Sequence, residues 1–296
     1  SRPIIVTQTN NRLGIALMLS ATLVFATQDG ISRHLASEYN VWMVVMVRYW
    51  FFAAFVLFIA KLRSGSVRKA AHTTQPLFQI FRSLLLVIEI RAAVLSFVYV
   101  GLIQSMAIFS VNPLIVAALS GPILGEKVGL RRWVAICIGF VGILIILQPG
   151  ARALDFKLAL PMGSAVLFAL YSIFTRLGAR KDNAQTSFFW TGIVGAIFMT
   201  CIGIFHWEPM STTDSLWMFA LCITGILGHF LLIKSYEVAE ASGLQPFTYF
   251  HLVFVSILAM TIFGETIKTT TAIGATIVIA AGLYTIWRER QAAKVN

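Results

Sequence analysis

Apolar residues fill the chain in long, nearly uncharged runs that short polar stretches separate. A helix needs about 20 apolar residues to cross the hydrocarbon core of a membrane, within a range of about 17 to 25. The pattern therefore predicts an all-α membrane protein with ten transmembrane helices, including a third and an eighth that carry charges. The predicted spans are Leu13–Ser32, Val41–Ala60, Ile80–Leu102, Ser105–Leu124, Trp133–Gln148, Leu158–Thr175, Thr186–Phe205, Leu216–Tyr236, Gly243–Phe263 and Thr271–Trp287.

The two halves of the chain resemble each other. Leu23–Arg33 reads LVFATQDGISR and Val166–Arg176 reads VLFALYSIFTR, so Phe-Ala is followed at the same spacing by Ser or Thr and then Arg. Residues 1–150 and 151–296 then form two repeats with five predicted spans each. Because five is odd, the second repeat must be inverted relative to the first. Inverted repeats around a central cavity are a transporter architecture, although channels and membrane enzymes can also be repetitive.

Composition and charge agree with a membrane protein and give its orientation. Hydrophobic residues make up 58% of the 296 residues and charged residues only 12%, about half the charged share of a soluble domain. The net charge of +11 does not indicate nucleic acid, because the basic residues sit in short loops between apolar runs. Sixteen Lys and Arg, Arg82 among them, fall on the side of the N-terminus and four on the other side. Because basic residues collect in cytoplasmic loops, we predict a multi-pass protein of the cytoplasmic (inner) membrane with both termini in the cytoplasm.

A signature in the first half indicates a family. Asn112–Trp133 reads NPLIVAALSGPILGEKVGLRRW, an apolar helix that closes on Gly-Glu and is followed by a basic pair. Tyr249–Ile267, YFHLVFVSILAMTIFGETI, is a looser copy in which His251 stands near where the family usually has a proline. With two such halves, the chain resembles the EamA-type drug/metabolite transporter superfamily over essentially its whole length. The resemblance implies a central cavity mainly among the first, third, fourth, sixth, eighth and ninth spans.

The resemblance also implies transport and leaves the substrate open, because the signature residues are largely architectural. Family members export amino acids, drugs and other metabolites, and relatives carry nucleotide sugars and triose phosphates. Only Arg48, Arg91 and Lys234 lie deep in spans, too few for a polyphosphate. We therefore predict a secondary transporter that exports small organic solutes, with amino acids as the leading candidate, by alternating access among membrane lipids. Export of drugs or nucleotide-sugar-type metabolites, and a membrane-embedded lipid-handling enzyme, are the alternatives.

Polar side chains inside the spans are the candidates for the solute site, because such groups are costly to bury in a membrane. Glu89 is also the candidate for carrying a coupling proton. Asp29 and Arg48 suit a structural role equally well, and Lys234 and Glu237 can neutralise each other three residues apart. The residues predicted to bind the solute near mid-membrane are Gln28, Glu89, Tyr99, Asn112, Tyr171, His229, Tyr249 and His251.

Two further pairs have predicted mechanical roles. Pro113 and Pro246 each delete a helical hydrogen bond inside a span, so we predict that they act as hinges, cavity linings or both. Glu126 and Glu265 close apolar spans and are predicted to be structural, capping or tying the span ends without touching solute.

Enzyme chemistry has no visible pattern in the sequence. It contains no HExxH, no Gly-Lys-Ser/Thr phosphate loop and no clustered His/Cys/Asp set. Its three cysteines suit neither a disulfide framework nor a zinc site. We therefore expect no catalytic residues, no metal and no cofactor.

Overall fold

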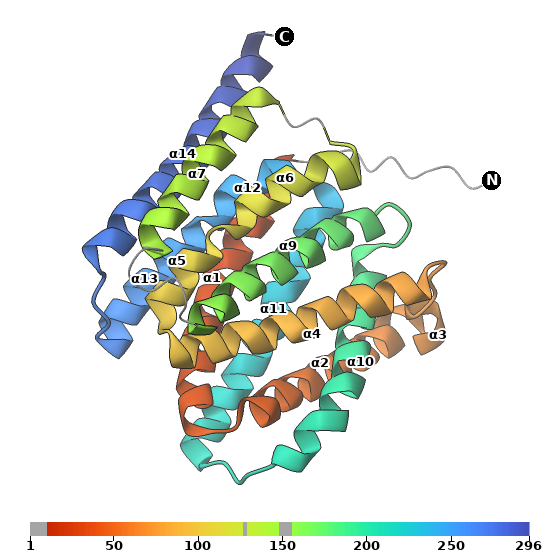
Figure 1. Cartoon of the computed structure of the whole chain (residues 1–296). Helices are drawn as coiled ribbons and strands as arrows, with labels where there is room; N and C mark the ends of the chain where they lie inside the picture. The colour runs from red at the N-terminus through yellow and green to blue at the C-terminus, as the bar shows by residue number, and fades with distance from the viewer. Residues whose placement is uncertain (1–10, 127–128, 148–155, 296) are drawn as a thin grey trace, which may run out of the picture.

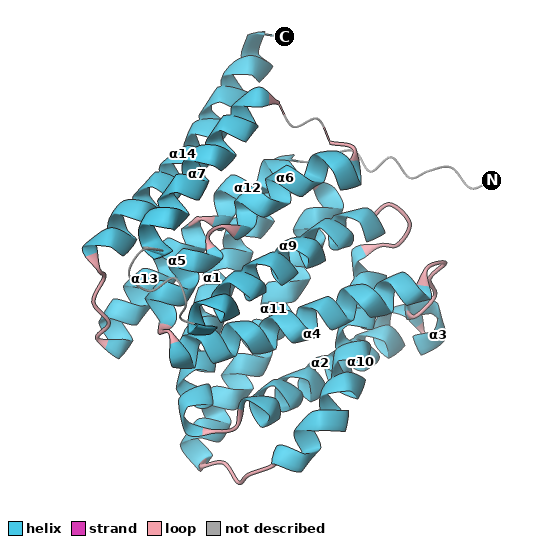
Figure 2. Cartoon of the chain, viewed as in Figure 1, coloured by secondary structure: helices cyan, strands magenta, loops and turns pink. Residues whose placement is uncertain are grey.

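The described part of the protein consists of helices and loops, with no strand (Figure 1, Figure 2). The structure is a computed structural model that describes residues 11–126, 129–147 and 156–295. Its α-helices are α1 (Asn11–Glu38), α2 (Val41–Ser64), α3 (Val67–Ala70), α4 (Pro76–Tyr99), α5 (Leu102–Phe109), α6 (Asn112–Leu124), α7 (Leu130–Leu147), α9 (Ala159–Gly178), α10 (Ala184–Gly203), α11 (Thr212–Val238), α12 (Ala241–Thr248), α13 (Phe250–Phe263) and α14 (Thr269–Val295). Two short 3₁₀ helices, η1 (Phe156–Leu158) and η2 (Ile204–His206), complete the set.

Seven stretches of the described residues are long and apolar enough to cross a membrane, which supports a multi-pass membrane protein. Two of them cover helix pairs, α5 with α6 and α12 with α13. α4 is not among the seven, because Arg82, Glu89 and Arg91 make it too charged for a span defined by hydropathy. The count of ten crossings therefore stays a prediction. The seven stretches are Arg12–Glu38, Val41–Leu62, Leu102–Leu124, Ala159–Gly178, Ala184–His206, Thr212–Val238 and Gly243–Phe263.

Helices of the two halves pack against each other in reciprocal pairs. α1 packs along α11, while α9, the first long helix of the second half, packs along α4 of the first half. α2 pairs with α10, and α7 pairs with α14 at one edge of the molecule (Figure 1). If each helix is exchanged for its counterpart in the other half, the α1–α11 contact becomes the α9–α4 contact, and the α2–α10 and α7–α14 contacts stay the same. Halves related by a two-fold axis would produce this pattern, and their opposite orientation in a membrane stays a prediction.

Two predicted spans are each divided into two shorter helices. The fourth predicted span consists of α5 and α6, and the ninth consists of α12 and α13. Pro113 lies in the first turn of α6, where its missing N–H leaves a carbonyl of the preceding segment without its helical donor. Pro246 lies inside α12, shortly before that helix ends at Thr248. Both prolines are thus next to a break, and their role as hinges stays a prediction.

The two Gly-Glu pairs end α6 and α13 in the same way. Gly125 has φ 70° and Gly264 has φ 62°, a left-handed conformation that only glycine adopts without steric cost and that often closes a helix. After this turn, Glu126 lies with a carboxylate oxygen 4.0 Å from Nε of Arg176 on α9. The end of α6 is thereby placed beside a helix of the other half.

Glu265 serves a different helix from the one it follows. Its carboxylate accepts hydrogen bonds from the backbone N–H groups of Leu102 at 3.0 Å and Ile103 at 2.9 Å, in the first turn of α5. It also pairs with Arg33 of α1. The residue therefore caps the start of α5 and ties three helices together at one end of the molecule. A role that excludes solute contact stays a prediction for both glutamates.

Arg82 corrects the charge count that gave the orientation. The loop count includes it on the side of the N-terminus, but its side chain has no exposed surface and lies inside the bundle on α4. The guanidinium donates to the side chains of Gln79, Thr175 and Thr191, and to the backbone carbonyl of Ser187 at 2.6 Å. Arg82 thus joins α4 to α9 and α10, and fifteen rather than sixteen basic residues remain for the loops on the side that is predicted to be cytoplasmic.

Candidate solute-binding cavity

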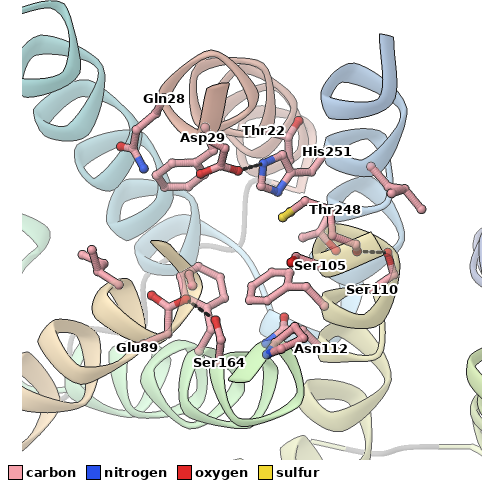
Figure 3. A pocket seen from close by; sticks show the side chains of 18 of the residues that line it. Thr22, Gln28, Asp29, Glu89, Ser105, Ser110, Asn112, Ser164, Thr248 and His251 are labelled. Carbon is pink, nitrogen blue, oxygen red and sulfur yellow. Dashed lines mark hydrogen bonds and ion pairs between the residues drawn. The ribbon is translucent and has the colours of Figure 1, made fainter. Parts of the chain in front are cut away.

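A cavity lies between the two halves, and both halves form its wall (Figure 3). The lining side chains come from α1, α4, α5, α6, α9, α11, the break between α12 and α13, and α13, with Arg48 added from α2. In terms of the predicted spans these are the first, third, fourth, sixth, eighth and ninth, plus one residue of the second. The cavity contains about 960 Å³ of empty space, including the part that is open to solvent.

Most of the side chains predicted to bind solute line this cavity. The six that do so are Gln28, Glu89, Asn112, His229, Tyr249 and His251, and Pro113 lines it as well. Tyr99 and Tyr171 lie outside the lining. Tyr99 is the last residue of α4, beyond the cavity, and is 58% exposed. Tyr171 is completely buried behind the ring of His229, with the ring centroids 6.5 Å apart.

Asp29 and His251 form a polar contact across the two halves. Oδ2 of Asp29 on α1 lies 2.8 Å from Nε2 of His251 on α13, and both side chains are largely buried (Figure 3). The contact links α1 of the first half to α13 of the second half, so it would have to break if these helices separated. Asp29 is therefore a cavity residue that the predicted site omitted.

The Glu89 carboxylate receives a hydrogen bond from one side chain of the described residues. Its Oε1 accepts a hydrogen bond from Oγ of Ser164 on α9 at 2.8 Å, and its side chain points into the cavity (Figure 3). Only 5% of the residue is exposed. Within the described residues, Ser164 is its one hydrogen-bond partner, and no Lys, Arg or His forms an ion pair with it. The cavity therefore contains a buried carboxylate without a direct counter-charge from the described part of the protein.

Arg48 carries the one guanidinium that lines the cavity. Its Nη2 donates to Oε1 of Gln28 at 3.0 Å and contacts Nε2 of His229 at 3.1 Å. Because a guanidinium only donates, Nε2 of His229 must accept, which places the ring proton of a neutral His229 on Nδ1. Gly225 on α11 makes room for this arrangement, since a Cβ there would lie 2.8 Å from Nε of Arg48. Arg48 thus has neutral partners in α1 and α11.

Asn112 and several hydroxyl groups complete the polar part of the wall. Nδ2 of Asn112 donates to the carbonyl of Ala165 at 2.8 Å and so fixes the start of α6 against α9. The hydroxyl groups of Ser96, Ser105 and Ser110 donate to backbone carbonyls. Since each hydroxyl proton is already used, the oxygen atoms are left to accept hydrogen bonds from a solute or water.

Aromatic rings form the apolar part of the wall. Phe25, Phe97, Phe109, Phe168 and Tyr249 all line the cavity. The rings of Phe109 and Phe168 lie 5.5 Å apart at an angle of 51°, which joins α5 to α9. A wall of phenyl rings with a few placed polar groups is the usual composition of a small-molecule site.

The residues that the predicted site missed lie on helix faces with a recognisable spacing. On α1 the lining residues are Met18, Thr22, Phe25, Asp29 and Ser32, besides Gln28. Their steps of three and four residues mark one face of a helix, and a polar residue on such an apolar stripe is the signal that could have found them. Ser164 has the same kind of signal, because it lies on one face of α9 with Pro161 and Phe168.

The arrangement suits reversible binding of an organic solute. Carboxylates, a guanidinium, hydroxyl groups and rings surround one space, and both halves contribute to it. In the described part of the chain, no group of three or more His, Cys, Asp or Glu side chains is arranged to hold a metal ion.

Comparison with known proteins shows a family and a fold. The model of the EamA-like transporter family matches residues 12–148 and again residues 156–287. A solved structure described only as the crystal structure of a protein superposes with a TM-score of 0.71 over 92% of this chain and 96% of that one. Its sequence identity is 12%, so this likeness supports the fold alone.

Several similar proteins are named as transporters of one of two compounds. A riboflavin transporter of Vibrio cholerae is 28% identical over 95% of both chains. An S-adenosylmethionine uptake transporter of Rickettsia prowazekii is 25% identical over 94% of both chains. A riboflavin transporter of Rhizobium johnstonii is 24% identical over 94% of this chain and 92% of its own.

Proposed function

This chain belongs to the EamA-like transporter family, and we propose that it carries a small organic solute with a fused heteroaromatic ring across the cytoplasmic membrane. The observation that carries the proposal is the cavity between the halves, which combines phenyl rings with a few fixed polar groups. A flat ring system can stack on such a wall, while hydroxyl, amide and charged groups at its edge hold the ring's substituents.

The named relatives support this solute class. Riboflavin and S-adenosylmethionine both contain a fused nitrogen heterocycle with a polar chain attached, and similar proteins are named as their transporters. The expectation of amino acids finds no support in these names. S-adenosylmethionine does, however, carry the amino and carboxylate groups of an amino acid, so the polar residues predicted for an amino acid remain suitable for one end of such a solute.

We propose uptake as the direction of transport. The sequence led us to expect export, but the S-adenosylmethionine relatives are named as uptake transporters. A secondary transporter runs in the direction that its gradients give it, so the direction depends on the coupling and not on the shape of the cavity. The placement of both termini in the cytoplasm belongs to the same proposal and rests on the loop charges.

Alternating access is the proposed mechanism, and two features support it. The cavity wall is divided between the halves, so movement of one half against the other would open it on either side. The broken helix pairs α5–α6 and α12–α13 place bendable backbone beside the cavity. Arg82, outside the cavity lining, joins α4 of the first half to α9 and α10 of the second half by buried hydrogen bonds, so movement of the halves would have to rearrange this contact.

Transport by the purified protein tests the proposal. The full chain is reconstituted into sealed liposomes, and entry of riboflavin and of S-adenosylmethionine is measured together with a representative amino acid. We expect saturable entry of at least one of the two heterocyclic compounds, with no covalent change in the recovered solute. Liposomes without protein are the control. Uptake of the amino acid alone would overturn the proposed solute class, and chemical conversion of the solute would favour an enzyme.

A further inference from the structure

We infer that the solute is a cation and that its positive centre binds beside the Glu89 carboxylate, against the neighbouring phenyl rings. The inference rests on the proposed function, because it assigns a charge to the solute of the same cavity. Riboflavin is neutral at neutral pH and S-adenosylmethionine carries a sulfonium centre, so the two named solutes of the relatives differ in this property.

Glu89 and Asp29 are the two carboxylates of the lining, and they differ in their direct partners. Oδ2 of Asp29 lies 2.8 Å from the imidazole nitrogen Nε2 of His251. Glu89 receives a single hydrogen bond from the neutral hydroxyl of Ser164. A buried carboxylate is unfavourable unless a counter-charge or further hydrogen bonds stabilise it. Glu89 is therefore the lining carboxylate that a cationic solute would stabilise most.

Arg48 is directed to other partners than Glu89. It lines the same cavity, but its Nη2 is turned to Gln28 and His229, and it makes no ion pair with Glu89. His229 accepts from Arg48 and has a guanidinium beside it, so a second positive charge on that ring would be repelled. Arg48, Gln28 and His229 are thus engaged with one another between α1, α2 and α11.

The surface around Glu89 suits an organic cation better than a metal ion. Glu89, Ala93 and Phe97 recur at four-residue steps and so share one face of α4, and Phe168 follows Ser164 by four residues on α9. The Phe109 ring packs on the Phe168 ring at 5.5 Å. Phenyl faces attract cations that are weakly hydrated, such as sulfonium or alkylated ammonium groups. A hard metal ion would need several oxygen ligands, and Glu89 offers one carboxylate.

Binding of a matched pair of compounds tests the inference. S-adenosylmethionine has a sulfonium, and S-adenosylhomocysteine is the same molecule without the methyl group and has a neutral thioether. Equilibrium binding of both, and of riboflavin, is measured on the purified full chain. We expect the sulfonium compound to bind at least about tenfold more tightly than the thioether, and Glu89→Gln to bring the two dissociation constants to within about threefold of each other.

Controls separate the charge of Glu89 from a folding defect. Glu89→Asp keeps the charge and should keep the order of affinities. Glu38→Gln removes an exposed carboxylate at the end of α1 and should leave the ratio as it is. Each variant must elute from size exclusion as the parent does, and Glu89→Gln should still bind the thioether.

Three results overturn the inference. They are equal binding of both compounds by the parent, an unchanged preference in a folded Glu89→Gln, and binding of riboflavin without binding of the sulfonium. In the last case the proposed function survives, because a heterocyclic solute is still bound. If none of the three compounds is bound or transported, the proposed function fails and the inference fails with it.

Discussion

Replacing Glu265 by alanine should destabilise the fold before it changes what the protein carries. The change removes the acceptor of two backbone hydrogen bonds at the start of α5, from Leu102 and Ile103, and one partner of Arg33. Loss of a capping side chain costs about 0.5–2 kcal/mol. The ion pair adds at most about 1 kcal/mol, because both side chains are partly exposed and solvent screens them. We therefore expect a loss of about 0.5–3 kcal/mol.

Equilibrium unfolding in mixed detergent micelles measures this loss. Glu265→Gln keeps an acceptor oxygen and loses the charge, so its loss of stability should fall between those of the parent and of the alanine variant. Arg33→Ala should have a smaller effect, since the two N–H bonds at α5 remain. Glu38→Ala, at an exposed position of α1, is the control for removing any carboxylate. A stable Glu265→Ala protein with an altered solute profile would refute the structural role.

The remaining predictions concern orientation, coupling and the polar contact between the halves. A cysteine at Ser211, in the loop before α11, should react only with reagent outside the cell; labelling from the cytoplasm alone would show the orientation to be wrong. Glu89→Gln should transport independently of a pH gradient and still exchange solute for solute, whereas retained pH-gradient dependence would exclude Glu89 as the coupling group. Asp29→Asn and His251→Gln should each slow liposome uptake by about tenfold. Because the two residues are in contact, the double variant should lose less transport free energy than the two single variants added together. Strictly additive losses would show that the contact is not used.

The sequence predicted the long helices well, because their signal is local. Apolar runs of about 20 residues have one structure available in a bilayer, and the helices of the structure fall on them. The helix ends at Gly125 and Gly264 could also be predicted, since a glycine after an apolar helix is a common helix end. The breaks within the fourth and ninth predicted spans could be predicted only in part. Proline lies next to each break, but hydropathy continues across both, so the pattern predicted single spans.

The candidate site was less predictable, because which helix face looks inward depends on tertiary packing. Glu89 and Gln28 were found because a polar residue in a span is conspicuous. Ser164 was missed because a serine hydroxyl can form its hydrogen bond within a helix and is less conspicuous than a charged side chain, although Ser164 shares one face of α9 with Pro161 and Phe168. Tyr99 and Tyr171 were predicted to line the cavity because the helices that carry them do line it. Tyr99, however, lies beyond the cavity at the end of α4, and Tyr171 is buried behind the cavity wall. Residue type and depth alone could not distinguish these outcomes.

The two buried arginines show how the surroundings decide what a charge can do. Arg82 distributes its donors over three side chains and a carbonyl of α4, α9 and α10, so the protein itself satisfies most of the guanidinium. Arg48 has the same chemistry, but its hydrogen bonds to described residues come from Nη2 only. A guanidinium has five N–H donors, so Arg48 keeps donors for a group that enters the cavity. Arg82 therefore acts as a connection between helices, while Arg48 lines the solute cavity.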